Sequence, residues 1–354
     1  MTKSFSHKQP YPLGAHTEGG GVRFSFVSKA EACGILLYDR TGRLSEKIPF
    51  ASEDRIGNVY CRTVGDIDTK ACTYLFYEDE DLIPDIRGRV FPKRIPYGRE
   101  RSAEDMKAGF LTDDFDWGED SFPRIPYHHA VCYCLHVRGF TKHASSKVEH
   151  RGTFAGIREK IPYLKEIGIT TLELQPAYEF TEIPLREESS RKLGAVPAVT
   201  EMPSRNDLNY WGYKKGYYYA PKAAYAASGD GVREMKELVR ELHKNGMELV
   251  MEFYFPKEVK GSEILDILCF WLLEYHVDGF HLLGENLPVD MLAGDDLLAD
   301  SKLWYYGFDT QGIYDRNEQP RCAHLAEYND AWYYDMRRYL KGDGNMLGGV
   351  LYHM

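Results

Sequence analysis

The chain has 354 residues, with 44 Lys or Arg and 54 Asp or Glu, so its formal net charge is −10 at pH 7. This acidic balance argues against nucleic acid or an anionic membrane surface as the main partner. No apolar run reaches the roughly 18 residues that a membrane span needs, and the amino-terminal stretch lacks the apolar core of a signal peptide. We therefore expect a cytoplasmic protein of one to three domains.

The seven cysteines are scattered, and only Cys132 and Cys134 lie close together. Alternate positions of one strand give poor zinc geometry, so we expect neither a metal nor a cofactor and interpret the cysteines as reduced, buried thiols. Aromatic residues make up 14% of the chain, and 26 of them are tyrosines. Such rings build β-rich cores or stack on the apolar faces of sugars, and composition leaves both interpretations open.

The first part of the chain, residues 1–96, predicts a β-sandwich. Residues 22–27 alternate between apolar and polar side chains, and further strand-like runs follow at 34–38, 59–63 and 72–77, with turn residues between them. Short strands at this spacing are typical of a small sandwich. Residues 97–127 are charged and loop-like, and we interpret them as a linker.

From residue 128 onward, strand-like and helix-like segments alternate. Helical patterns occupy 232–244 and 262–275, and the candidate strands are 131–138, 171–175, 248–254, 279–283, 304–307 and 324–328. This alternation predicts parallel βαβ units, and we expect residues 128–354 to form an incomplete (β/α)₈ barrel of the TIM type. An open doubly wound sheet is the second choice, because no Gly-x-Gly-x-x-Gly follows the first strand.

Several motifs occur in a fixed order between about residues 11 and 345. They are Tyr133-Cys-Leu-His136-Val-Arg138-Gly-Phe140, Leu172-Glu173-Leu-Gln-Pro176, Asn209-Tyr210-Trp211-Gly212-Tyr213, Tyr219-Ala-Pro221-Lys and Glu327-Tyr-Asn329-Asp330. With these motifs the chain resembles the α-amylase superfamily, glycoside hydrolase family 13, in its isoamylase, pullulanase and glycogen-debranching branch. From Tyr11-Pro-Leu-Gly14 onward, the amino-terminal part resembles the carbohydrate-binding module of family 48 that precedes such barrels.

The resemblance implies a retaining mechanism in which one carboxylate attacks the anomeric carbon and another protonates the leaving oxygen. The family's nucleophile ends the fourth strand, where this chain has Leu283, and its acid/base ends the fifth strand, where the best match is Phe308. Glu252 retains the acidic character of a structural Asp on the third strand, and the chain stops at Met354, before the family's seventh-strand His-Asp pair. Since members of a catalytic set act as a unit, we expect no glucan hydrolysis by the family mechanism.

Substitute carboxylates follow the fourth predicted strand. Glu285, two residues after Leu283, could act as a displaced nucleophile if the strand continues. The simpler interpretation is that Glu285 is a solvated loop acid of an acidic protein. The same interpretation applies to the neighbouring acids, Asp290, Asp295, Asp296 and Asp309.

Four residues are candidates for sugar contact: His136, Tyr210, Trp211 and Tyr213. The resemblance implies that the last tyrosine of the loop motif stacks on the sugar at the cleavage position. Packing of the three aromatic rings against the barrel wall is an equal alternative, and His136 could be a satisfied core histidine. We expect the aromatic runs 217–219 and 332–334 to serve packing.

Six strands cannot close a barrel that needs eight, and they leave two edges with unpaired backbone groups. The open side of the barrel could be completed by the rest of a longer gene product, or it could be covered by a partner enzyme or a second copy of the chain. The apolar, glycine-rich segment 342–354 could also serve as one closing strand.

Three hypotheses follow. In the first, the chain is a catalytically silent relative of α-glucan debranching enzymes that binds an α-glucan oligo- or polysaccharide, or partners with an active enzyme. In the second, it is an active hydrolase of pullulan, glycogen or starch, with relocated acids or as part of a longer chain. In the third, it is an assembly protein without sugar binding, and its exposed barrel edge supports a homodimer.

Overall fold

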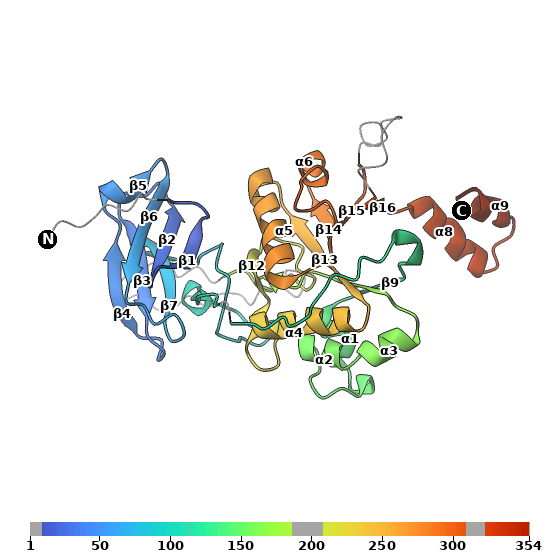
Figure 1. Ribbon diagram of the computed structural model, residues 1–354, viewed down its shortest axis with the longest axis horizontal. Coiled ribbons are helices and arrows are strands. Elements are labelled where there is room, and N and C mark those ends of the chain that lie inside the picture. The colour runs from blue at the N-terminus through green and yellow to red at the C-terminus, as the bar shows by residue number, and fades with distance from the viewer. Residues whose placement is uncertain (1–8, 113, 186–207, 309–322, 354) are drawn as a thin grey trace, which may run out of the picture.

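The computed structural model describes residues 9–112, 114–185, 208–308 and 323–353. A β-rich amino-terminal body lies beside an α/β body, and two carboxyl-terminal helices project from the far end (Figure 1). The expected fold class is confirmed, since a β-sandwich precedes a curled, parallel, incomplete barrel. Within the described residues, no helix combines the length and apolar character required to cross a membrane.

The amino-terminal body consists of two antiparallel four-stranded sheets, ordered β1-β2-β6-β5 and β4-β3-β7-β8. Side chains such as Phe24 and Phe26 of β2 and Phe76 of β7 are buried between them, and the rings of Phe26 and Phe76 stack 4.3 Å apart. The strands are β1 (Gly14–Glu18), β2 (Gly21–Val27), β3 (Cys33–Tyr38), β4 (Leu44–Pro49), β5 (Arg55–Ile56), β6 (Val59–Gly65), β7 (Thr73–Glu78) and β8 (Asp81–Ile83).

The first part of the predicted linker packs against this sandwich. Ala108 exchanges backbone hydrogen bonds of 2.8 and 2.9 Å with Tyr74, and the ring of Phe110 stacks on the ring of Tyr74. Buried Met106, Ala108 and Phe110 share the core of the sandwich. The domain boundaries at 1–96, 97–127 and 128–354 stay a prediction.

The second part of the predicted linker covers the amino-terminal ends of the barrel strands. Asp120 lies 2.9 Å from His243 Nδ1 and 2.7 Å from His276 Nδ1, and the N–H of Ile125 donates to Glu248 at the start of β13. This segment therefore covers the amino-terminal ends of the central strands.

The α/β body is built on one parallel sheet of six strands, ordered β16-β15-β14-β13-β10-β9. All six strands expected from the sequence are present, and β9 and β16 form the two edges of this sheet in the described part of the chain. A short antiparallel pair, β11 and β12, stands beside the sheet. The strands are β9 (Cys132–Leu135), β10 (Thr171–Leu174), β11 (Tyr178–Glu179), β12 (Tyr217–Pro221), β13 (Glu248–Phe255), β14 (Gly279–Gly284), β15 (Lys302–Tyr305) and β16 (Leu325–Glu327).

Helices cover one side of this sheet. On α4, Asp230 caps the first turn by accepting from the Arg233 N–H, and buried Met235, Leu238 and Leu242 recur at helical spacing to face the core. The described α-helices are α1 (Val137–Lys142), α2 (Phe154–Arg158), α3 (Ile161–Glu166), α4 (Gly231–Lys244), α5 (Gly261–Tyr275), α6 (Val289–Ala293), α8 (Asp330–Leu340) and α9 (Leu347–His353).

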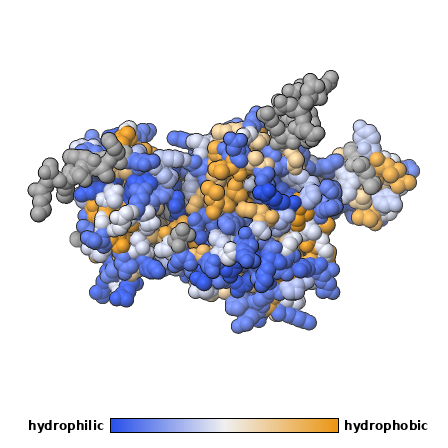
Figure 2. Space-filling view, viewed as in Figure 1, coloured by the Kyte–Doolittle hydropathy of each residue, from blue (hydrophilic) through white to orange (hydrophobic). Residues whose placement is uncertain are grey.

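The outer side of α5 is apolar, in contrast to that of α4. Leu265, Phe270 and Leu272 are only partly buried against the core, and Leu273 is 63% exposed. Apolar residues also gather over α5 in Figure 2.

Two expectations about the carboxyl-terminal segment are wrong. Residues 347–353 form the helix α9 instead of a closing strand, because positive φ angles at Gly342 and Asn345 turn the chain so that it packs against α8. The aromatic run at Trp332, Tyr333 and Tyr334 is exposed instead of packed, since α8 projects away from the barrel (Figure 1).

Candidate functional site

The candidate site is the concave face of the six-stranded sheet, meaning the side opposite α4 and α5. Successive side chains of a strand point to opposite faces. On β14, Phe280 and Leu282 are fully buried in the core beneath the helices, so His281 and Leu283 belong to the concave face.

Leu283 stands at the carboxyl end of β14 and is half-buried. Its backbone is paired in register with Tyr254 of β13. The strand ends at Gly284, where φ is +136° and an added Cβ would lie 2.0 Å from the carbonyl oxygen of Phe255. The strand thus ends with the side chain of Leu283, a hydrocarbon that can neither attack an anomeric carbon nor donate a proton to a leaving group.

Phe308 follows β15 and is buried. Its ring meets the ring of Tyr305 edge-on at 5.7 Å, and its backbone N–H donates to Glu327 Oε1 at 2.7 Å. The Glu327 carboxylate thus anchors the backbone at this position, and the Phe308 side chain is part of the core.

The loop acids after β14 lie outside the sheet. Glu285 is exposed, and its N–H donates to the carbonyl oxygen of Phe255. Asp290 and Asp296 are exposed, and half-buried Asp295 accepts from the N–H of Leu297. Asp309 lies outside the described residues. The role of Glu285 as a displaced nucleophile stays a prediction without a contact that supports it.

Two buried carboxylates, which sequence reasoning did not treat as part of a site, occupy the concave face. Glu173 Oε1 lies 2.6 Å from His281 Nδ1, and Glu252 Oε2 lies 3.9 Å from the same nitrogen. The pKa of Glu252 is raised overall, because the effect of burial exceeds the opposing effect of a hydrogen bond from Tyr213. The sequence could have indicated this, because the alternation of side chains along the strands places Glu173, Glu252 and His281 on the concave face.

The cysteines of β9 border these carboxylates, and here the expectation of burial is wrong. Cys132 and Cys134 are exposed, because β9 is an edge strand whose inner side lies at the open end of the sheet. Crowding by surrounding protein and the nearby Glu173 carboxylate raise the pKa of both thiols. The other described cysteines are free and are buried or half-buried, and Cys322 lies outside the described residues.

The loop that carries Tyr210, Trp211 and Tyr213 depends on one glycine. Gly212 has φ of +85°, and an added Cβ would lie 2.7 Å from Pro176 Cβ and 2.8 Å from the ring of Phe180. Its carbonyl oxygen also accepts from the hydroxyl of Tyr178. Only glycine combines this backbone conformation with such close approach, so Gly212 sets the position of the aromatic residues beside it.

The three aromatic candidates have different surroundings. The ring of Tyr210 stacks on His136 at 4.9 Å. Trp211 is 47% exposed, with its ring edge-on to His136. Tyr213 is 36% exposed; it hydrogen-bonds to Glu252, and its ring lies 6.1 Å from that of Tyr254. Trp211 and Tyr213 thus offer ring surface to solvent, whereas Tyr210 packs against protein.

His136 is buried and has protein partners on both ring nitrogens. Nδ1 accepts from the N–H of Gly139 and thereby caps α1, so Nε2 carries the proton and donates to the Tyr225 hydroxyl at 3.0 Å. Burial lowers the pKa of His136 to about 4. These contacts favour the core interpretation, and a direct sugar contact of His136 stays a prediction.

Two exposed tyrosines on the concave face were missed. Tyr306 is 54% exposed and Tyr328 is 41% exposed, and their rings stack 5.1 Å apart. The ring of Tyr328 also stacks on His281 at 4.9 Å. Tyr306 directly follows β15 and Tyr328 directly follows β16. Both lie in the last two positions of the strands expected from the sequence, and this location was the available signal.

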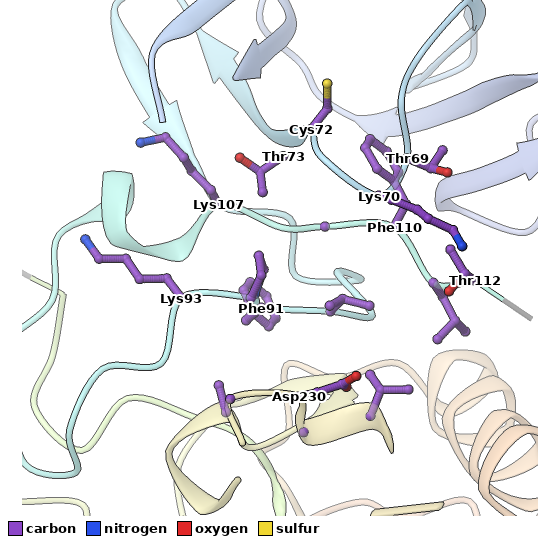
Figure 3. A pocket seen from close by; sticks show the side chains of 18 of the residues that line it. Thr69, Lys70, Cys72, Thr73, Phe91, Lys93, Lys107, Phe110, Thr112 and Asp230 are labelled. Carbon is purple, nitrogen blue, oxygen red and sulfur yellow. The ribbon is translucent and has the colours of Figure 1, made fainter. Parts of the chain in front are cut away.

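A separate cavity of about 810 Å³ lies between the sandwich and the start of α4 (Figure 3). Phe91, Phe110, Lys93 and Lys107 line its sandwich side, and Asp230 lies opposite them (Figure 3). Its lysines are engaged within the protein, for example Lys93 with Asp105 and Lys107 with Glu104. None of the residues that line it belongs to the concave face, so it forms no part of the candidate site.

Comparison with known proteins shows which family this barrel is similar to. The model of the alpha-amylase catalytic domain matches residues 135–258. The chain is 26% identical to chloroplastic isoamylase 1 of Oryza sativa subsp. japonica, over 96% of this chain and 54% of the relative. The chain is a relative of the debranching branch of the α-amylase superfamily. The GlgX homolog of a Mycobacterium bovis glycogen operon is also 26% identical, over 96% of this chain and 58% of the relative.

Solved structures agree with this placement at the level of the fold. A mutant pullulanase from Paenibacillus barengoltzii, complexed with maltotriose, superposes with a TM-score of 0.65 at 18% identity, covering 91% of this chain and 58% of the pullulanase. The GBS pullulanase SAP, complexed with maltotetraose, superposes with a TM-score of 0.66 at 18% identity, covering 92% of this chain and 50% of the pullulanase. This debranching-enzyme relative spans about half the length of the curated relatives it matches.

Proposed function

We propose that the chain binds α-glucan on the concave face and does not hydrolyse it by the retaining mechanism of the family. The observation that carries this proposal is Leu283 at the end of β14, on the side of the sheet that bears His281. A retaining glycosidase needs two carboxyl groups about 5–5.5 Å apart. The two positions that match those of the carboxyl groups hold Leu283 and Phe308, and neither side chain has an ionisable group.

Exposed aromatic rings support the binding half of the proposal. Trp211, Tyr213, Tyr306 and Tyr328 are each between 36% and 54% exposed. Aromatic rings offer flat apolar surface, and tyrosine adds a hydroxyl for hydrogen bonding, which suits the apolar faces and hydroxyl-rich edges of glucose units. The pullulanases of similar fold are described in complex with maltotriose and maltotetraose, so a linear α-glucan is the ligand class that we propose.

A hydrolase with relocated acids has less support. The best-placed carboxyl groups, those of Glu173 and Glu252, are both buried, and Glu173 is engaged by His281. A sugar would have to displace these contacts to meet them. Association with a partner enzyme or a second copy through β9 or β16 stays a prediction.

Affinity electrophoresis in gels containing glycogen or pullulan tests the binding. We expect retarded mobility of the chain, less retardation for Trp211→Ala and Tyr213→Ala, and no change for Tyr333→Ala, which removes a ring that is 46% exposed on α8. Mobility that polysaccharide leaves unchanged would contradict glucan binding.

Reducing-sugar release from the same polysaccharides tests the proposed lack of hydrolytic activity, with an active pullulanase as the positive control. We expect no release above background. Release that survives repurification and disappears in Glu252→Gln or Glu173→Gln would instead establish a hydrolase with relocated acids.

A further inference from the structure

Three neighbouring strands bring cation-binding side chains together on the concave face. Cys134 of β9 is in register with Glu173 of β10, and Glu252 extends from β13 on the far side of β10. The Cys134 Sγ and one carboxylate oxygen of each glutamate all lie within 4.8 Å of one another. From the sequence we consider zinc only for the pair Cys132 and Cys134 and expect no metal. The tertiary structure combines Cys134 with two distant glutamates instead.

We propose that Cys134, Glu173 and Glu252 bind a divalent transition-metal ion, with Zn²⁺ as the best fit. Zn²⁺ accepts thiolate and carboxylate ligands, whereas Mg²⁺ and Ca²⁺ select oxygen ligands. Three protein ligands leave one tetrahedral position open, and exposed Cys134 keeps that position accessible to solvent. On binding, the Cys134 thiol releases its proton to water, and the thiolate sulfur forms the bond to the metal.

The distances suit this ion after a small contraction. Ligand atoms around a tetrahedral Zn²⁺ lie roughly 3.3–3.6 Å apart, given Zn–O near 2.0 Å and Zn–S near 2.3 Å. The observed limit of 4.8 Å therefore has to shrink by about 1 Å. Rotation of the glutamate side chains can supply this movement, because the paired strands β9, β10 and β13 hold the backbone in place.

An unpartnered buried atom points independently to a missing cation. Glu252 is only 3% exposed, and its Oε1 has no hydrogen-bond partner. A buried polar atom without a partner is unfavourable, and a metal ligated by this oxygen would satisfy it.

The charge around the cluster supports the same conclusion. Within the described part of the chain, both carboxylates form an ion pair with His281, and neither forms one with a Lys or Arg. His281 also holds Glu173 through its hydrogen bond of 2.6 Å, and such contacts behind a ligand orient it toward a metal. The site therefore combines two carboxylates, a thiol and a positioning histidine, without a fixed positive charge among the described residues.

Titration of the full chain with Co²⁺ tests the site, because a cobalt–thiolate bond gives a charge-transfer absorption that oxygen ligands do not. We expect one equivalent of Co²⁺ to produce this band and Zn²⁺ to abolish it by displacement. Cys134→Ser should remove the band. Glu252→Gln should weaken Co²⁺ binding at least tenfold, and His281→Gln should weaken it by about 10–100-fold. Cys269→Ser, which changes a half-buried thiol of α5, should leave the titration unchanged.

A second readout covers the case in which a variant fails to fold. In the unmodified chain, Zn²⁺ should protect Cys134 from alkylation, as mapped by mass spectrometry of the labelled peptides, and leave the labelling of Cys72 unaffected. Absence of the band together with full labelling of Cys134 in the presence of Zn²⁺ would overturn the proposal. A band that persists in folded Cys134→Ser would overturn it as well.

Discussion

His281 of β14 and Glu173 of β10 are joined across the intervening strand β13, with 2.6 Å between Nδ1 and Oε1. Both side chains are buried, and their contact connects two strands of the half-barrel that are not adjacent. The same pair orients the carboxylate that we propose as a metal ligand.

Replacing His281 by Ala should destabilise the barrel by about 1–3 kcal/mol, because it leaves the buried Glu173 carboxylate without its main donor. Urea unfolding followed by circular dichroism measures the change. His281→Gln keeps a side-chain N–H donor and should recover part of the loss. Equal losses in the two variants would show that packing of the imidazole, and not its hydrogen bond, sets the stability.

Gly212→Ala should destabilise the chain by about 1–3 kcal/mol and weaken glucan retention. The reason is the positive φ combined with contacts of 2.7 and 2.8 Å from the new Cβ to Pro176 and Phe180. Gly98→Ala is the matched control, since Gly98 has φ of +79° and nothing within 4 Å of an added Cβ. The difference between the two variants in thermal unfolding isolates the clash, and equal effects would contradict its importance.

Lys222→Met should be among the most destabilising substitutions, at about 3–5 kcal/mol. Lys222 is fully buried, and Nζ lies 3.3 Å from Glu179 and 2.6 Å from Glu182, so its removal leaves buried carboxylates with Arg101 as their remaining cation. Lys70→Met is the control, because the pair of Lys70 with Asp114 is exposed, and exposed pairs contribute about 0–1 kcal/mol. Denaturant unfolding of both variants measures the contrast, and similar losses would contradict this account.

Acid should weaken the fold partly through His136. Its pKa is lowered to about 4 from 6.5, chiefly by burial, so between these values the unfolded chain binds more protons than the folded chain. The free energy of unfolding contributed by His136 is therefore complete above pH 6.5 and is lost as the pH falls toward 4. His136→Asn keeps an acceptor for the helix cap and should show a shallower loss between pH 7 and pH 5. Parallel unfolding curves for the two proteins over this range would contradict the assignment.

The sequence alone was sufficient for the succession of the strands along the chain and for the family resemblance. Periodicity reports which side of an element is apolar, and it located all six strands of the half-barrel as well as α4 and α5. It failed for residues 332–334 and 342–354, because aromatic and apolar composition does not say which surface, if any, a segment meets. It also failed for Cys132 and Cys134, since burial depends on whether β9 is an edge strand, which only pairing decides.

The chemistry of the site divides in the same way. The assignment of Leu283 and Phe308 to the positions of the nucleophile and the acid/base rests on the family resemblance of the sequence and stays a prediction. The meeting of Cys134, Glu173, Glu252 and His281 is a property of the tertiary structure, because parallel pairing brings side chains up to 147 positions apart in the sequence onto neighbouring levels of a single face. Local pattern determines which face a residue occupies, and strand order decides its neighbours there.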